Sequence, residues 1–299
     1  MAQLGVNGLQ IEYDTFGDAG ADPILLIMGL GTQMTAWSSD FCNALAAHDH
    51  YVVRFDNRDI GLSTKFNGAE APSRLRYVMH HLFQTPLPAP YSLEDMADDA
   101  AGVLTALGLE SVHVVGASMG GMIAQLLTVK YPQRVKTLTS IMSTSGDPAL
   151  PRARPDVVRH VFTSRPNTGD RNAMLKHLTR SAQLISSPAY PRSDEQWREL
   201  ITASLERSFY PMGFVRQMAA IVADGSRVKR LQTIDKPTLV IHGSEDPLVP
   251  VECGIDTARH IKGARLEIIE GMGHDLPPQL VDQLTTMIAA HAKNQQTNR

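Results

Sequence analysis

The stretch GASMG at residues 116–120 follows directly on the apolar run VHVV at residues 112–115, and this junction is the strongest signal in the chain. A helical pattern follows it and stops before a Tyr-Pro pair, so Ser118 stands between a buried strand and a helix. Small residues two positions to either side, Gly116 and Gly120, let such a turn be sharp and leave the hydroxyl exposed above the sheet edge. We therefore interpret the stretch as a nucleophile elbow rather than as a glycine-rich turn with a serine helix cap.

The chain around this junction alternates short apolar runs with helical patterns. Strands are expected at residues 10–16, 24–28, 51–55, 112–115, 135–142, 238–242 and 265–269, and helices near 39–48, 92–108, 119–130 and 278–292. Alternation of this kind predicts an α/β fold, in which a mostly parallel sheet carries helices on both faces. The pair Asn7-Gly8 indicates a hairpin and thus an antiparallel leading edge.

The alternation stops between about residues 147 and 230, where only helical spacing is found. An insertion of this length between two strands must fold as its own layer, and we expect it to cap the sheet edge above Ser118. The predicted organisation is a core over residues 1–146, a helical cap over 147–230 and the second part of the core over 231–299. Three aromatic residues of this cap are candidates for lining a substrate pocket: Trp197, Phe209 and Phe214.

Composition narrows the class of protein. The chain has 299 residues and a net charge of −3, which gives no reason to expect a nucleic acid as a partner. Its two cysteines, Cys42 and Cys253, are too few and too far apart for a disulfide framework or a metal site. The first residues lack a secretory signal, and the early apolar run at 24–28 is too short to span a membrane. We expect a cytoplasmic protein with no membrane partner, and no pattern predicts an oligomeric state.

The base that would activate Ser118 has to be selected by position. A serine hydroxyl becomes a good nucleophile when an imidazole takes its proton and a carboxylate orients that imidazole. Of the eleven histidines, His274 follows the strand at 265–269 through the flexible loop GMG at 271–273. Its loop leaves the carboxyl end of a parallel strand, where catalytic groups of open α/β sheets gather. His274 is therefore the candidate base.

The carboxylate has several candidates. Asp246 lies on the loop after the strand at 238–242, at the edge where His274 also emerges. Asp147 also leaves the sheet at that end and is a rival, while Glu245 and Asp275 are weaker ones. The chain order serine, aspartate, histidine that is expected for this fold favours Asp246.

An oxyanion formed on the substrate would need two hydrogen-bond donors. The backbone N–H of Met119 at the helix start is one candidate, and that of Leu30 in the loop Gly29-Leu30-Gly31 is the other. Read as a dinucleotide motif, the same loop has Met34 where a third glycine is required, so no nucleotide cofactor is expected.

Four separated blocks, taken together, resemble a known family. These are MGLG at 28–31, DNRDIGLS at 56–63, GASMGG at 116–121, and GSEDPLVP at 243–250 with GMGH at 271–274. Over nearly its whole length the chain resembles an α/β-hydrolase with a helical cap. Two features resemble the aclacinomycin methylesterase branch of this family. Met28 stands where many members have histidine, and residues 58–61 have the sequence RDIG.

The resemblance implies a role for each candidate. Ser118 would be the nucleophile, Asp246 the acid and His274 the base, with the amides of Leu30 and Met119 as the oxyanion hole. The resemblance also implies structural roles for three residues of the second block: Asp56, Arg58 and Ser63. No cofactor or metal is implied.

The predicted activity is hydrolysis of a small-molecule carboxylic ester through an acyl-enzyme. A serine nucleophile argues against the haloalkane dehalogenases and epoxide hydrolases, which use aspartate on the same scaffold. Thioester, lactone and C–C bond hydrolysis and a cofactor-free perhydrolase or haloperoxidase activity use the same triad and stay open. From another class, a receptor-like binding protein with vestigial hydrolysis also stays open.

Overall fold

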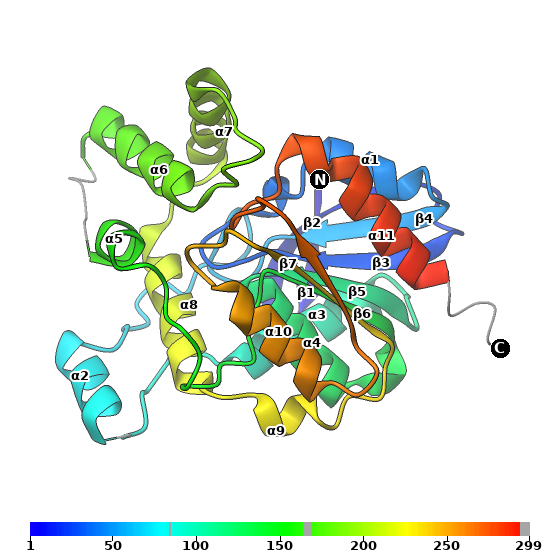
Figure 1. The fold of residues 1–299 in the computed structure, drawn as a ribbon, viewed down its shortest axis with the longest axis horizontal. Helices are drawn as coiled ribbons and strands as arrows, with labels where there is room; N and C mark the ends of the chain where they lie inside the picture. The colour runs from blue at the N-terminus through cyan, green and yellow to red at the C-terminus, as the bar shows by residue number, and fades with distance from the viewer. Residues whose placement is uncertain (84, 164–168, 294–299) are drawn as a thin grey trace.

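The computed structural model describes residues 1–83, 85–163 and 169–293 and is built on one eight-stranded sheet (Figure 1). The strands are β1 (Ala2–Val6), β2 (Leu9–Phe16), β3 (Asp22–Ile27), β4 (His50–Phe55), β5 (Val112–Ala117), β6 (Val135–Ile141), β7 (Thr238–Gly243) and β8 (Arg265–Ile269). Their order across the sheet is β1-β2-β4-β3-β5-β6-β7-β8. Only the pairs β1–β2 and β2–β4 are antiparallel, and β3–β4, β3–β5, β5–β6, β6–β7 and β7–β8 are all parallel. The predicted fold class, a mostly parallel α/β sheet, is confirmed.

The hairpin between β1 and β2 turns on the predicted dipeptide. Asn7 and Gly8 have φ angles of 51° and 79°, the left-handed conformation that a two-residue hairpin turn with the twist of its strands requires. The antiparallel leading edge expected from the sequence is therefore present.

Helices cover both faces of the sheet, and the alternation of side chains along β3 shows why. Leu25 and Ile27 join the core cluster formed with α3 (Leu93–Ala106) and α4 (Met119–Lys130). Ile24 and Leu26 point to the other face and pack with α1 (Ser39–Ala46) and α11 (Val281–Lys293). The four buried positions of β3, residues 24–27, are therefore all apolar, as is typical of parallel strands that are covered on both faces.

Most of the remaining helices belong to the insertion between β6 and β7. Between β6 and β7 the chain forms α5 (Pro155–Val157), α6 (Arg171–Ile185), α7 (Asp194–Arg207), α8 (Pro211–Asp224) and α9 (Val228–Leu231), with a π-helical segment at Val158–Thr163. Helix α10 (Val251–His260) joins β7 to β8, and short 3-10 turns occur at Met34–Ala36, Pro132–Arg134 and Pro278–Leu280. In Figure 1, α5 to α8 stand to one side of the sheet. No strand interrupts this insertion within its described residues, which agrees with the helical spacing of the sequence.

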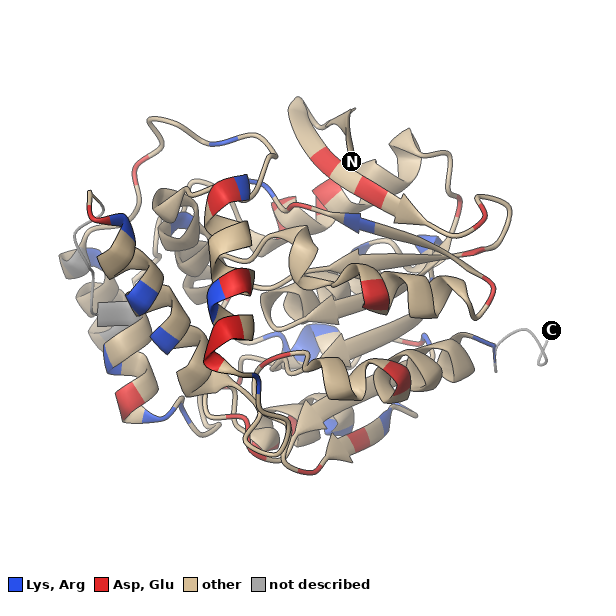
Figure 2. Ribbon diagram, turned by 90° about the horizontal axis from the view of Figure 1, so that it is seen from above, with Lys and Arg blue, Asp and Glu red and all other residues tan. Residues whose placement is uncertain are grey.

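Helix α2 (Arg74–Phe83) was not predicted from the sequence. It projects from the body (Figure 1) and leaves Leu75, Leu82 and Phe83 more than half exposed. No helix of the described chain is long and apolar enough to cross a bilayer. Figure 2 shows acidic and basic residues on the same helices and loops across the molecule.

Burial of histidines makes the fold sensitive to acid. Burial lowers the pKa of His291 on α11 from 6.5 to about 4, so protonation is easier in the unfolded chain. The stability that a neutral His291 contributes is present above pH 6.5 and is lost as the pH falls toward 4. We expect the melting temperature to fall across that window, and to fall less steeply in His291→Gln. The loss of unfolding free energy between the two ends of the window should differ between the two proteins by about 3 kcal/mol. Parallel pH profiles of melting temperature for the two proteins would contradict this.

Candidate active site

Ser118 occupies a strained turn between β5 and α4. Its backbone has φ 56° and ψ −121°, a conformation that residues other than glycine rarely adopt. The turn is held on both sides of the peptide: the Ser118 N–H donates to the carbonyl of Ile141 at 2.9 Å, and the Ser143 hydroxyl donates to the Ser118 carbonyl at 2.8 Å. Surrounding hydrogen bonds of this kind are what allow a strained residue to persist at a functional site.

The two glycines of the turn have no room for a side chain. A methyl group on Gly116 would overlap the backbone of Gly120, and one on Gly120 would overlap the carbonyl oxygen of Ile27 in β3. The turn can therefore approach the sheet this closely only with glycine at both positions.

Gly120→Ala should destabilise the protein strongly, because backbone atoms rather than a flexible side chain fill the space. Overpacking of this kind costs typically 1–3 kcal/mol, and we expect a value at or above about 3 kcal/mol here. Chemical denaturation would measure it, with Gly20→Ala as the control because an added Cβ there meets only Asp18 Oδ1 at 3.5 Å. Equal stability of the two variants would show that the turn can relax.

The structure brings Ser118, His274 and Asp246 into one hydrogen-bonded chain. His274 Nε2 lies 2.9 Å from Ser118 Oγ, and His274 Nδ1 lies 2.6 Å from Asp246 Oδ2. Asp246 Oδ1 accepts the backbone N–H groups of Leu248 at 2.9 Å and Val249 at 2.8 Å. The carboxylate side chain is fully buried, and each of its oxygens has a partner. This arrangement orients the imidazole with Nδ1 toward the carboxylate and Nε2 toward the hydroxyl.

Asp246, and not one of its three rivals, is the carboxylate bonded to His274 Nδ1. Asp147 sits with Asp256 and His260, their potential ligand atoms all within 4.8 Å of one another. This is the group of three possible metal ligands found among the described residues. It includes neither His274 nor Asp246, which form the hydrogen-bonded series with Ser118. Glu245 is exposed, and Asp275 Oδ1 accepts the N–H and hydroxyl of Ser187.

Other potential nucleophiles and bases are held neutral by burial. Burial raises the pKa of the Cys253 thiol to about 11 and that of Cys42 to about 12, so neither is a thiolate at neutral pH. His242 has no exposed surface; its Nε2 lies 2.8 Å from the Val249 carbonyl, and burial lowers its pKa. His242 therefore supports the loop of Asp246, and its burial favours the neutral imidazole.

The loop after β3 packs directly against the serine. A Cβ on Gly29 would lie 3.0 Å from Ser118 Cβ and 3.5 Å from its Oγ. The next residue is Leu30, whose N–H was predicted as an oxyanion donor. Met119 is the first residue of α4, so its N–H has no acceptor within the helix. Both predicted donors thus belong to segments that border Ser118.

The insertion between β6 and β7 also holds the loop of His274. The His274 N–H donates to the Ile185 carbonyl at 2.7 Å, and the Gly273 N–H donates to the Ser187 hydroxyl at 2.8 Å. Sequence reasoning did not identify Ser187, because a single serine after a helix forms no pattern. Its role depends on a contact with a residue 86 positions along the chain.

The three aromatic candidates have different surroundings. Trp197 is buried, with the Arg192 guanidinium over its ring at 5.2 Å, and Phe209 is 42% exposed. Phe214 lies at the loop after β3, where a Cβ on Gly31 would come within 2.6 Å of its ring. That these residues line a substrate pocket stays a prediction.

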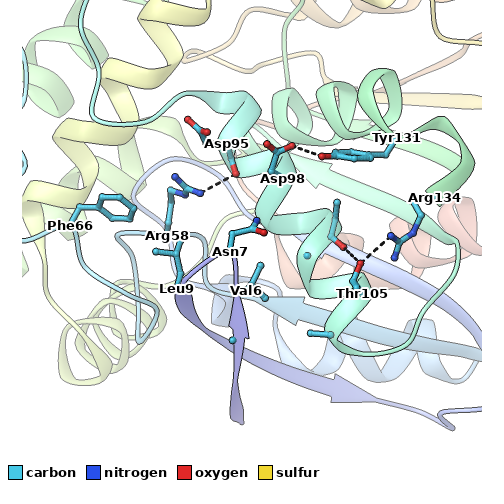
Figure 3. A pocket seen from close by; sticks show the side chains of 14 residues that line it. Val6, Asn7, Leu9, Arg58, Phe66, Asp95, Asp98, Thr105, Tyr131 and Arg134 are labelled. Atoms are coloured by element: carbon cyan, nitrogen blue, oxygen red, sulfur yellow. Dashed lines mark hydrogen bonds between the residues drawn. The ribbon is translucent and has the colours of Figure 1, made fainter.

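A depression of about 760 Å³ lies away from Ser118, between the β1–β2 hairpin and α3 (Figure 3). Its polar groups are already partnered: Arg58 donates to the Asp95 carbonyl at 3.1 Å, and the Tyr131 hydroxyl donates to Asp98 at 2.8 Å. Ser118, His274 and Asp246 are not among the residues that line it. We assign it no ligand.

Comparison with known proteins shows the family to which the chain belongs. Residues 22–278 match the family model described as alpha/beta hydrolase fold, and the chain belongs to that family. The chain is 29% identical over 300 residues to the rhodomycin D methylesterase DauP of Streptomyces sp. (strain C5), covering 93% of each chain. It is 32% identical to a poly(3-hydroxyalkanoate) depolymerase of Ectopseudomonas oleovorans, covering 84% of this chain and 77% of the relative.

Solved structures show the same fold. The meta-cleavage product hydrolase CumD of Pseudomonas fluorescens IP01 superposes with a TM-score of 0.78 at 20% identity, covering 98% of both chains. The resemblance to α/β-hydrolases, and to their methylesterase branch, is therefore confirmed.

Proposed function

We propose that the protein is a cofactor-independent carboxylic ester hydrolase that acts through Ser118, His274 and Asp246. The observation that carries this proposal is the continuous hydrogen-bonded chain from Ser118 Oγ through the imidazole to a buried carboxylate. Its similarity to methylesterases over 93% of its length supports ester hydrolysis as the reaction.

Acylation of the serine would begin the reaction. His274 Nε2 takes the proton of Ser118 Oγ as that oxygen attacks the ester carbonyl carbon. The negative charge on the tetrahedral intermediate is stabilised by the N–H groups of Met119 and Leu30. His274 then donates its proton to the departing alkoxide, which leaves as the alcohol.

Deacylation repeats these steps with water. His274 takes a proton from water as the water oxygen attacks the acyl-enzyme carbonyl, and it returns that proton to Ser118 Oγ as the acid departs. Asp246 holds the ring orientation throughout and stabilises the imidazolium. No metal or cofactor takes part in any step.

The insertion at 147–230 is proposed as the cap over this site, between core segments 1–146 and 231–299. Two contacts support this role: its residues bond the loop of His274, and Phe214 lies against the loop of Leu30. We propose that Trp197, Phe209 and Phe214 contribute to the acyl or alcohol pocket. A cytoplasmic location, with neither nucleic acid nor membrane as a partner, stays a prediction.

Hydrolysis of p-nitrophenyl esters of increasing acyl length tests the proposed reaction. We expect turnover with short acyl chains and release of one equivalent of acid per alcohol without added metal or nucleotide. Parallel assays with methyl esters, thioesters, lactones and peracid formation compare the chemistries that the triad allows. Absence of turnover on every ester, with ligand binding retained, would favour a receptor-like protein instead.

A further inference from the structure

The loop that carries Leu30 is fastened at both ends by buried carboxamides from different parts of the chain. At its start, Asn57 Nδ2 donates to the Met28 carbonyl at 2.8 Å. At its end, the Gly31 N–H donates to Gln217 Oε1 at 2.9 Å. Asn57 belongs to the core, whereas Gln217 lies on α8 in the insertion, 186 residues from Gly31.

Gln217 uses both ends of its side chain. Its Nε2 donates to the Arg58 carbonyl at 2.9 Å while its Oε1 accepts from Gly31, and the residue has no exposed surface. Because one partner is a donor and the other an acceptor, rotating the carboxamide by half a turn would break both bonds. The side chain therefore has one orientation, and it fixes the position of Gly31 relative to Arg58.

This bond limits the freedom of the peptide that follows Leu30. The Leu30 carbonyl accepts from the Thr32 hydroxyl at 3.1 Å, and the N–H of the same peptide is the one that donates to Gln217. Phe214, one turn earlier on α8, fills the space beside Gly31, whose φ of +66° only glycine adopts readily. Within the described chain, the Leu30 N–H itself has no protein acceptor, so it is available to a ligand.

We propose that Gln217 is a positioning residue of the active site, which holds the Leu30 N–H where the oxyanion forms. Through Gln217, helix α8 would then contribute to the rate of the reaction, although Gln217 itself does not contact the substrate. The inference rests on the proposed function, since it assigns the Leu30 N–H to an oxyanion.

Gln217→Met tests the proposal, because methionine keeps the length of the side chain and removes both hydrogen bonds. Misplacement of an oxyanion donor by about an ångström can cost on the order of 10²-fold, and we expect kcat to fall by roughly 10- to 100-fold with little change in KM. A trifluoromethyl ketone, whose adduct with Ser118 is a tetrahedral oxyanion, should lose affinity in parallel with kcat/KM.

Gln125→Met is the matched control. Gln125 on α4 is also fully buried and also uses both ends, donating to Ser140 Oγ at 3.3 Å and accepting from Arg227 Nε at 3.1 Å. We expect a similar loss of melting temperature in the two variants, but kcat and ketone affinity should stay near the wild-type values in Gln125→Met. An equal effect of both variants on kcat would show that Gln217 only stabilises the fold.

Gln217→Glu provides a second and independent readout. A protonated glutamic acid can accept from Gly31 and donate to Arg58 as glutamine does, whereas the ionised form cannot donate. We expect its kcat, relative to wild type at each pH, to exceed that of Gln217→Met and to rise as the pH falls. A kcat ratio to wild type that does not change with pH would overturn the proposal, and this outcome needs no measurement on Gln217→Met.

One series of assays distinguishes failure of the proposed ester hydrolysis from failure of the role of Gln217. A wild-type enzyme that hydrolyses no ester and does not bind the ketone would overturn the proposed function and this inference with it. A wild-type enzyme that is active and inhibited, beside an equally active Gln217→Met, would overturn the inference alone.

Discussion

Ser118→Ala should lower ester turnover by about 10⁶-fold, the loss seen when a serine hydrolase loses its nucleophile. The hydroxyl that lies 2.9 Å from His274 Nε2 is removed, while the strained backbone is kept. Alanine at φ 56° is no more strained than serine, so we expect the melting temperature to change little. Initial rates on a short-chain p-nitrophenyl ester, with Ser39→Ala on the exposed surface of α1 as the control, measure the effect.

The residual rate in this variant is informative. The oxyanion hole and substrate binding alone leave a serine hydrolase some 10³- to 10⁴-fold above the reaction in water. If Ser118→Ala and wild type hydrolysed the ester at the same rate, the activity would come from another group and the assignment of the nucleophile would be wrong.

Asp246→Asn should have the second largest effect, roughly 10⁴-fold on kcat. The asparagine side chain can still accept from Leu248 and Val249, but its NH₂ group would face His274 Nδ1 in place of Oδ2. The ring would then carry its proton on Nε2, where it cannot take the proton of Ser118. The effect is therefore on the tautomer rather than on the fold.

Asp147→Asn is the matched comparison for this variant. Asp147 follows β6 at the same end of the sheet, but it lies with Asp256 and His260 and is not bonded to His274. We expect its kcat to stay near that of the wild type. A severe loss in Asp147→Asn together with a mild one in Asp246→Asn would reassign the acid.

Much of the fold and of the candidate site could be read from local pattern. Ser118 was identifiable because a buried strand, small flanking residues and a helix follow one another within a few positions, and each leaves its own signature. The places of Asp246 and His274 in loops after strands were equally local, whereas the order of the three residues along the chain favoured Asp246 only through the expected fold. Helix α2 was missed because its apolar side chains are exposed, so their periodicity does not mark a buried face.

Residue order alone was sufficient for the α/β sheet, the turn at Ser118 and the candidates Ser118 and His274, because hydrophobic periodicity and glycine placement act over a few neighbouring positions. Tertiary structure alone decided that Asp246 rather than Asp147 meets His274, and that Ser187 and Gln217 fasten the loops of His274 and Leu30. The spacing of residues on a helix shows which side chains share a face, whereas the partner of that face depends on how the insertion packs on the sheet. A hydrogen bond between residues 31 and 217 is therefore set by the packing of whole elements, to which no short stretch of sequence corresponds.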